Sequence, residues 1–417
     1  MKLLNKFLFI EEQHIKREEV LWNAIFSMLS ALQSILFLLF ITRLCGEDAA
    51  GVFSLAFSIA YLMIMLGNYG VRNYQVTDVR DRFHFQEYGS HRIITCVSMM
   101  LCSVIYVMLK GYSQEKFIVI LLFCALKMLE SVEDVFHGAY QQRGRLDIAS
   151  KIGTLRYAVT IIGFIGTLLI TRKLIDAAIV SVIFSLIALV GLVWYTFPYS
   201  GIKKETMRWT ECGRLFFICF PLFISGFFNM YICNASKYAI DKYLTDAIQG
   251  YYGMIFMPVF VINLLSNCIY RPHLVELANF WIEGKTAELR KFTFKQLGMI
   301  IGICFLVVFV GYIAGIPVLS IFYGTDLKPY RMELVILLIG GGMTSIVDFL
   351  NNIITVMREQ NIMIWIYGVV FVLAYICSGF FVKEWGIMGA AVSYTVLLFI
   401  QACIMMACTI RKLKSKS

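Results

Sequence analysis

One apolar stretch of the sequence contains five ionisable side chains. Lys127, Glu130, Glu133, Asp134 and His137 stand among Met, Leu, Val and Phe residues. On a helix that turns about 100° per residue, all five fall within a wedge of about 120°. An ammonium group in such a wedge can hold an anion. The carboxylates can bind H⁺ or Na⁺, because an apolar setting favours their neutral form.

Two interpretations of this wedge stay open. Ionisable side chains in a membrane-spanning helix are costly and usually face a water-filled cavity. On that view Glu130, Glu133 and Asp134 are candidates for ion coupling. Alternatively, Lys127 and Glu130 neutralise each other at i, i+3 spacing, and the later members of the wedge already lie in the cytoplasmic interface.

A second acidic position lies in a later apolar stretch. Asp348 is followed one turn later by Asn351 and Asn352, and it lies about 214 residues after Asp134. If the chain contains a repeat, the two acids occupy corresponding positions, which suits a cation-coupled gate. The alternative is a polar patch through which two helices pack.

Four more basic residues lie in or at the ends of apolar stretches: Arg72, Arg156, Lys237 and Arg271. Together with Lys127 they are candidates for a cationic cavity that binds an anionic head group. For each of the four, the alternative is that the long side chain reaches the interface and keeps its charge in water.

Proline and glycine residues interrupt some of these stretches. Pro221 and Pro258 are expected to kink or break helices, because proline lacks the backbone N–H. The run Gly340–Gly342 either loosens a helix or allows close packing of a neighbour.

The composition identifies the elements that must position these side chains. Of the 417 residues, 59% are hydrophobic and only 15% charged, and the mean hydropathy is +0.76. A soluble domain carries roughly 25% charged residues. This excludes soluble, disordered and nucleic-acid-binding classes. The twelve cysteines show no CxxC pair, so neither a metal nor another cofactor is expected, and no P-loop is present.

The sequence predicts an all-α integral membrane protein with about twelve transmembrane helices. A spanning helix needs about 20 mostly apolar residues. The runs of that length are 20–41, 51–70, 92–109, 117–138, 152–171, 174–196, 215–236, 249–270, 296–315, 332–356, 362–382 and 386–410.

Basic residues predict the orientation of these spans. Lys and Arg are concentrated in the two tails and in the loops on the same side, so both termini are expected in the cytoplasm. The predicted parts are a cytoplasmic N-tail (1–19), an N-terminal six-helix bundle (20–198), a cytoplasmic linker (199–214), a C-terminal six-helix bundle (215–410) and a basic cytoplasmic tail (411–417). The short loops leave no room for a soluble catalytic domain, so no enzyme is expected.

The two halves contain similar short stretches in the same order. The pairs are Asp48–Phe53 with Asp246–Tyr252, Gln142–Arg145 with Met357–Gln360, and Leu174–Ile179 with Ile387–Val392. A repeat of six plus six spans keeps both halves in one orientation. This predicts a pseudo-twofold axis along the membrane normal, with a substrate site between the halves.

Four further stretches resemble the polysaccharide exporter family, the O-antigen flippase type of the multidrug/oligosaccharidyl-lipid/polysaccharide exporter superfamily. They are Ile41–Gly51, Gly67–Asp78, Ala239–Leu244 with Gly250–Tyr252 following, and Ile321–Gly324. The resemblance covers essentially the whole chain, although each stretch is short.

The resemblance implies a flippase for a polyprenyl-pyrophosphate-linked oligosaccharide in the cytoplasmic membrane, working by alternating access. Its expected partners are this substrate, membrane lipids and a glycan polymerase or glycosyltransferases, with no nucleic acid. On this reading Lys127 and the other basic candidates meet the pyrophosphate. A cation-coupled multidrug antiporter of the same superfamily, a membrane enzyme and a non-transporting scaffold for glycan assembly are the alternatives.

Overall fold

Most of the chain that the structure describes is helical. The computed structural model describes residues 7–8, 15–78, 82–199, 202, 205–270 and 273–415, and none of these forms a strand. Within these residues, ten helical stretches are long and apolar enough to span a membrane. The charged helix α6 adds another, and the longest stretch contains two helices, so the chain is an all-α membrane protein with about twelve spanning helices.

Between Ile15 and Thr196 the described residues form seven helices. They are α2 (Ile15–Cys45), α3 (Glu47–Asn68), the short α4 (Val71–Thr77), α5 (Phe85–Lys110), α6 (Gln114–Gln142), α7 (Leu146–Thr171) and α8 (Leu174–Thr196), followed by the 3-10 turn η2 (Phe197–Tyr199). The spanning members match the six predicted apolar runs. Several begin earlier than predicted, because polar residues extend the helix beyond the apolar run.

The second half contains longer and more broken helices. They are α9 (Trp209–Tyr243), α10 (Asp246–Phe256), α11 (Val259–Tyr270), α12 (Leu274–Ile282), α13 (Thr286–Val310), the π-helical turn η4 (Gly311–Gly315), α14 (Ile316–Tyr323), the 3-10 turn η5 (Lys328–Tyr330), α15 (Arg331–Val356) and α16 (Gln360–Ser415). Within α16 the backbone of Gly386 is non-helical, with φ 57°, so two spans meet there.

The predicted breaks have different outcomes. Pro258 separates α10 from α11, as expected. In contrast, α9 continues through Pro221, and α15 continues through the three glycines. A Cβ on Gly340 would lie 2.7 Å from a Thr395 side-chain atom. The structure therefore favours the close-packing interpretation of Gly340–Gly342.

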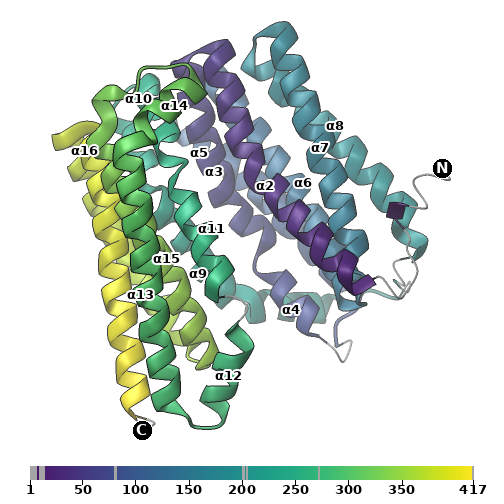
Figure 1. The fold of residues 1–417 in the computed structure, drawn as a ribbon. Coiled ribbons are helices and arrows are strands. Elements are labelled where there is room, and N and C mark those ends of the chain that lie inside the picture. Colours follow the sequence, from purple (N-terminus) through teal and green to yellow (C-terminus); the bar gives the residue numbers. More distant parts are fainter. Residues whose placement is uncertain are drawn as a thin grey trace. The chain divides into compact units, whose positions relative to one another are not determined.

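The chain forms two compact units, Met1–Phe227 and Phe228–Ser417, with the division inside α9. In the N-terminal unit α6 packs against α3, α5, α7 and α8, and in the C-terminal unit α15 packs against α11, α13 and α16 (Figure 1). The predicted two six-helix bundles, their boundaries and the pseudo-twofold axis stay predictions.

Phenylalanine side chains form much of the core of the N-terminal unit. Phe37 of α2 stacks on Phe164 of α7, with ring centroids 3.8 Å apart, and Phe53 of α3 and Phe123 of α6 complete the group. All four side chains are buried. Ser113 caps the start of α6 by accepting a hydrogen bond from the Lys116 backbone N–H. These contacts fix the helix that carries the predicted polar wedge.

Candidate functional site

The first pair on α6 joins Lys127 to Glu130. Both carboxylate oxygens of Glu130 lie 2.8 Å from Lys127 Nζ. The rings of Phe57 and Tyr61 on α3 have their centroids 4.8 and 4.3 Å from the same nitrogen, which adds cation–π attraction. Lys127 is only 1% exposed. Its charge is therefore balanced inside the N-terminal unit, as the alternative interpretation of the i, i+3 spacing predicted.

The second pair joins α6 to α7. Arg156 Nη2 lies 2.7 Å from Glu133 Oε2, and both side chains are buried. Arg156 Nη1 donates a hydrogen bond to Ser185 Oγ of α8. His137, one turn beyond Glu133, is also buried, with its Nε2 3.8 Å from Glu133 Oε1. Because the charges are buried, each depends strongly on its partner.

Two arginines share Asp134, the third carboxylate of the wedge on α6. Asp134 Oδ1 accepts a hydrogen bond from Arg72 at 2.9 Å, and Asp134 Oδ2 accepts one from Arg92 at 2.9 Å. Arg92 is buried and also donates to the Gly67 carbonyl and to Ser131 Oγ. The three ionised side chains carry one excess positive charge. We refer to Arg72, Arg92 and Asp134 as the arginine pair site.

The short helix α4 brings Arg72 to this site. Tyr69 and Gly70 have left-handed backbone conformations, with φ 50° and 69°, and they turn the chain after α3. Gln75 of α4 donates a hydrogen bond to the Val135 carbonyl of α6. A Cβ on Gly138 would lie 2.3 Å from Gln75 Oε1, so this close approach requires glycine. Arg72 keeps 30% of its side chain exposed.

Sequence reasoning missed several charged contacts of the N-terminal unit. The predicted third span started at residue 92, which placed Arg92 at a helix end, whereas α5 begins at Phe85 and carries Arg92 two turns inside. Buried Lys151 of α7 lies 3.3 Å from Glu18 of α2. Arg208 pairs with buried Glu87 at 2.6 Å, and this hydrogen bond raises the pKa of Arg208. Extending each helix past its apolar run would have placed Arg92 and Lys151 inside helices, although it would not have named their partners.

Asp348 lies in a different environment in the C-terminal unit. Asn263 Nδ2 of α11 donates a hydrogen bond to Asp348 Oδ2, and Asn267 in turn donates to Asn263. Tyr270 Oη donates to Asn267 Oδ1 at 2.6 Å, while Asn352 donates to the Asp348 backbone carbonyl at 2.7 Å. A chain of amide groups thus connects α11 and α15 around this acid. We call these five residues the amide cluster.

Among the predicted basic residues that the structure describes, Lys237 of α9 contacts an aromatic ring rather than a carboxylate. The centroid of the Phe256 ring lies 4.7 Å from its Nζ. No carboxylate of the described residues lies within 4.0 Å of that nitrogen. Arg271, the remaining candidate, lies outside the described residues. The binding and coupling roles of all these side chains stay predictions.

The chain is similar in sequence to a capsular polysaccharide biosynthesis protein, and its fold is similar to those of a flippase and a transporter. No protein-family model matches the chain. It is 22% identical over 379 residues to the capsular polysaccharide biosynthesis protein CapF of Staphylococcus aureus, covering 90% of this chain and 94% of CapF.

Two solved structures share its fold at low sequence identity. The lipid II flippase MurJ in an inward closed conformation matches with a TM-score of 0.69 at 13% identity, over 94% of this chain and 90% of MurJ. A variant of the MATE transporter VcmN of Vibrio cholerae matches with a TM-score of 0.64 at 13% identity, over 97% and 98% of the two chains. The fold is therefore that of the MATE transporters and MurJ.

Proposed function

We propose that this protein is a flippase that moves a polyprenyl-pyrophosphate-linked oligosaccharide across the cytoplasmic membrane by alternating access. The observation that carries the proposal is the similarity to a capsular polysaccharide biosynthesis protein along nearly the full length of both chains. The fold shared with a lipid II flippase supports the same cargo class, a glycan carried on a lipid.

The charges of the N-terminal unit suggest which residues meet the pyrophosphate. Lys127 and Arg156 are each neutralised by a carboxylate of α6. The arginine pair site keeps one excess positive charge, and its Arg72 is partly exposed. Because guanidinium groups bind phosphate oxygens in a bidentate manner, we assign the first contact with the head group to Arg72.

The C-terminal unit offers a second cationic candidate, Lys237. Its ammonium group has an aromatic neighbour and no described carboxylate partner, so its charge is available to an anion. We further propose that both termini lie in the cytoplasm, as the distribution of basic residues predicts. A glycan polymerase or glycosyltransferases that make and consume the cargo are the proposed protein partners.

The fold shared with MATE transporters favours one alternative, a cation-coupled multidrug antiporter. A cationic drug requires an acidic or aromatic site. Glu130, Glu133 and Asp134 of α6 are each paired with a Lys or Arg of this chain, which weakens that reading for the N-terminal unit. Asp348 of the amide cluster is the acidic candidate that remains for it.

A proteoliposome assay tests the proposed function. Purified protein is reconstituted with a fluorescent polyprenyl-pyrophosphate oligosaccharide, and the fraction that a membrane-impermeant quencher reaches is followed with time. We expect protein-dependent flipping that Arg72→Gln slows strongly. Arg143→Gln, which removes an exposed arginine just beyond α6, is the matched control and should flip like the wild type.

Two results would count against the proposal. If no flipping occurs and the same vesicles exchange an organic cation for H⁺ or Na⁺, the antiporter reading replaces it. If neither activity appears with correctly folded protein, a scaffold role in glycan assembly gains support. Flipping that survives Arg72→Gln would keep the function and remove Arg72 from the site.

A further inference from the structure

The exposed side of α15 is polar over about three turns near the end of the helix. The side chains between residues 344 and 355 that are not buried are all polar: Thr344, Asp348, Asn351, Asn352 and Thr355. The other positions of this segment are buried, and all but Ser345 are apolar. The five polar residues fall within about 100° around the helix axis, so they form one stripe. We call them the polar stripe.

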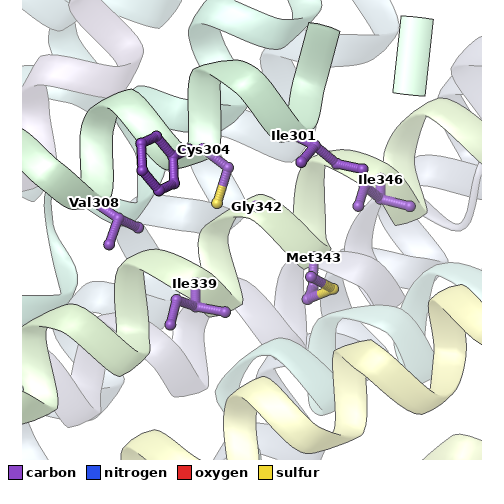
Figure 2. Close-up of a pocket in the computed structure, with 8 residues that line it drawn as sticks. Ile301, Cys304, Val308, Ile339, Gly342, Met343 and Ile346 are labelled. Carbon is purple, nitrogen blue, oxygen red and sulfur yellow. The ribbon is translucent and has the colours of Figure 1, made fainter. Parts of the chain in front are cut away.

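The opposite side of α15 has an apolar surface. Ile339, Gly342, Met343 and Ile346 lie about 180° from the polar stripe, and Figure 2 shows them beside apolar side chains of α13. Exposed positions in the middle of α13, such as Phe305 at 74%, are apolar, as contact with lipid chains requires. Polar groups are costly in hydrocarbon, so the polar stripe faces water or a hydrated ligand instead.

Helix α11 adds amide groups beside the polar stripe. Asn263, Asn267 and Tyr270 have the spacing i, i+4, i+7 and fall within about 60° around the axis of α11. The hydrogen bond from Asn263 to Asp348 joins this row to α15. Both asparagines are partly exposed, whereas Tyr270 is buried. The polar stripe and the amide cluster thus form one polar surface of amides, hydroxyls and a single carboxylate.

Part of the hydrogen-bonding capacity of this polar surface is unused within the described chain. The side-chain amide of Asn351 makes no hydrogen bond with a described residue. Asn352 donates to the Asp348 carbonyl at 2.7 Å and to Tyr270 Oη at 3.5 Å, while its Oδ1 accepts none from the described residues. Each asparagine amide carries two donors and one acceptor oxygen. The surface therefore offers donors and acceptors side by side to a bound molecule.

These groups suit a sugar better than an ion. A sugar hydroxyl is both donor and acceptor, so neighbouring hydroxyls pair well with an amide or a carboxylate. An anion such as pyrophosphate would meet the negative charge of Asp348. A hard metal ion needs several oxygen ligands, and among the described residues no group of three His, Cys, Asp or Glu side chains could hold one. The ligand that fits is a neutral molecule rich in hydroxyl groups.

We propose that this polar surface binds the glycan of the lipid-linked substrate. The amides of Asn351 and Asn352 and the carboxylate of Asp348 form hydrogen bonds with sugar hydroxyls. The inference rests on the proposed function and divides the head group between two sites, since Arg72 contacts the pyrophosphate and this surface contacts the uncharged sugars. A site built to hydrogen-bond a substrate rejects an analogue that lacks those groups, so the surface selects lipids that carry a glycan.

Binding to the protein in lipid nanodiscs tests the proposal without requiring transport. One ligand is the lipid-linked oligosaccharide extracted from cells that make this protein, and the other is bare polyprenyl pyrophosphate. Native mass spectrometry gives the dissociation constant of each. We expect the wild type to bind the glycan-bearing lipid at least about tenfold more tightly, as two hydrogen bonds would give. Equal affinity for the two lipids would overturn the proposal.

A matched pair of variants locates the site. Asn351→Leu removes an amide that bonds to no described residue, so its melting temperature should equal that of the wild type. Asn361→Leu makes the same change at an exposed position near the start of α16, outside the polar surface. We expect Asn351→Leu to bind the glycan-bearing lipid about tenfold more weakly and the bare lipid normally, and Asn361→Leu to bind both normally. Unchanged affinity of Asn351→Leu for both lipids would overturn the proposal, as would an equal loss for both.

The two proposals fail in different ways. Glycan-dependent binding that Asn351→Leu weakens, in a protein that shows no flipping in vesicles, would retain the glycan site and remove the flippase in favour of a scaffold. Flipping by a protein that binds both lipids equally would retain the flippase and remove the glycan site. If tetraphenylphosphonium, an organic cation, binds and neither lipid does, Asp348 belongs to an antiporter and both proposals fall.

Discussion

The two units treat the acids on their central helices differently. In the N-terminal unit, each carboxylate of the polar wedge on α6 (Glu130, Glu133 and Asp134) is paired with a Lys or Arg side chain. In the C-terminal unit, Asp348 of α15 accepts a hydrogen bond from an asparagine amide. Lys237 of the same unit contacts an aromatic ring and no described carboxylate. The charges of the α6 wedge are thus fixed in pairs, whereas Lys237 of the second unit lies against an aromatic ring.

This difference has an energetic consequence. Removing one partner of a buried ion pair leaves an uncompensated charge, while replacing both partners by neutral groups is often tolerated. A charge among neutral groups has no such dependence, and its removal is cheap. The N-terminal unit should therefore lose stability when single charges are changed. Replacing Lys237 of the C-terminal unit should instead change stability little.

Breaking the Arg156–Glu133 pair should have the largest effect. Arg156→Met leaves Glu133 buried without its cation and should lower the free energy of unfolding by about 3–5 kcal/mol. Thermal unfolding of the purified protein, followed by tryptophan fluorescence, measures this loss. The buried location of both side chains is the physical reason.

A double variant separates a structural role of this pair from a role in substrate binding. Glu133→Gln combined with Arg156→Met removes both charges and should recover most of the lost stability. If the pair is only structural, the double variant also flips substrate. A stable double variant that does not flip would show that one of the two residues has a direct role in transport. A double variant no more stable than Arg156→Met would contradict the ion-pair account.

The arginine pair site should give the next largest effect. Asp134→Asn removes the carboxylate that holds both arginines, and lost hydrogen bonds to charged groups cost about 2–3 kcal/mol. Arg92 keeps its bonds to the Gly67 carbonyl and Ser131, so the loss should stay below that of Arg156→Met. The same unfolding measurement checks this order. An Asp134→Asn protein as stable as the wild type would show that the arginines do not need the carboxylate.

In the C-terminal unit, a comparable loss should come from packing rather than charge. A methyl group on Gly342 would meet Cys304 Sγ at 2.3 Å, and overpacking of this kind typically costs about 1–3 kcal/mol. Gly302→Ala on α13 is the matched control, because no atom lies within 4 Å of its added Cβ. Gly342→Ala should therefore melt at a lower temperature than Gly302→Ala. Equal melting temperatures would show that α13 moves away from α15 without cost.

The sequence predicted the spanning helices and one local ion pair, but not where the helices begin. Apolar runs located the spanning helices, because a bilayer requires about 20 apolar residues in each. They did not locate helix ends: α13 begins at Thr286, whereas the apolar run begins at 296, since polar residues continue a helix outside the bilayer. The Lys127–Glu130 pair could be foreseen because i, i+3 residues are neighbours on one helix.

The other charged contacts join different helices, so no local spacing encodes them. Arg92 reaches Asp134 from α5, and Arg156 reaches Glu133 from α7. Helical periodicity placed the carboxylates on one face of α6 but could not name their partners. For the same reason, the sequence suggested Asn352 as a neighbour of Asp348 and missed Asn263 on α11.

Lys237→Met should have the smallest effect on stability and the most direct effect on function. Methionine keeps much of the side-chain volume and the contact with Phe256, and no described carboxylate loses a partner, so the free energy of unfolding should change by less than about 1 kcal/mol. If Lys237 binds the pyrophosphate, the variant should nevertheless flip the labelled substrate more slowly, while Lys237→Arg retains activity because the positive charge remains. Flipping by Lys237→Met at the wild-type rate would show that an unpaired lysine in this unit is not a substrate ligand. The candidate pyrophosphate ligands would then be those of the N-terminal unit. There, Arg72 is the partly exposed cation of a site with excess positive charge.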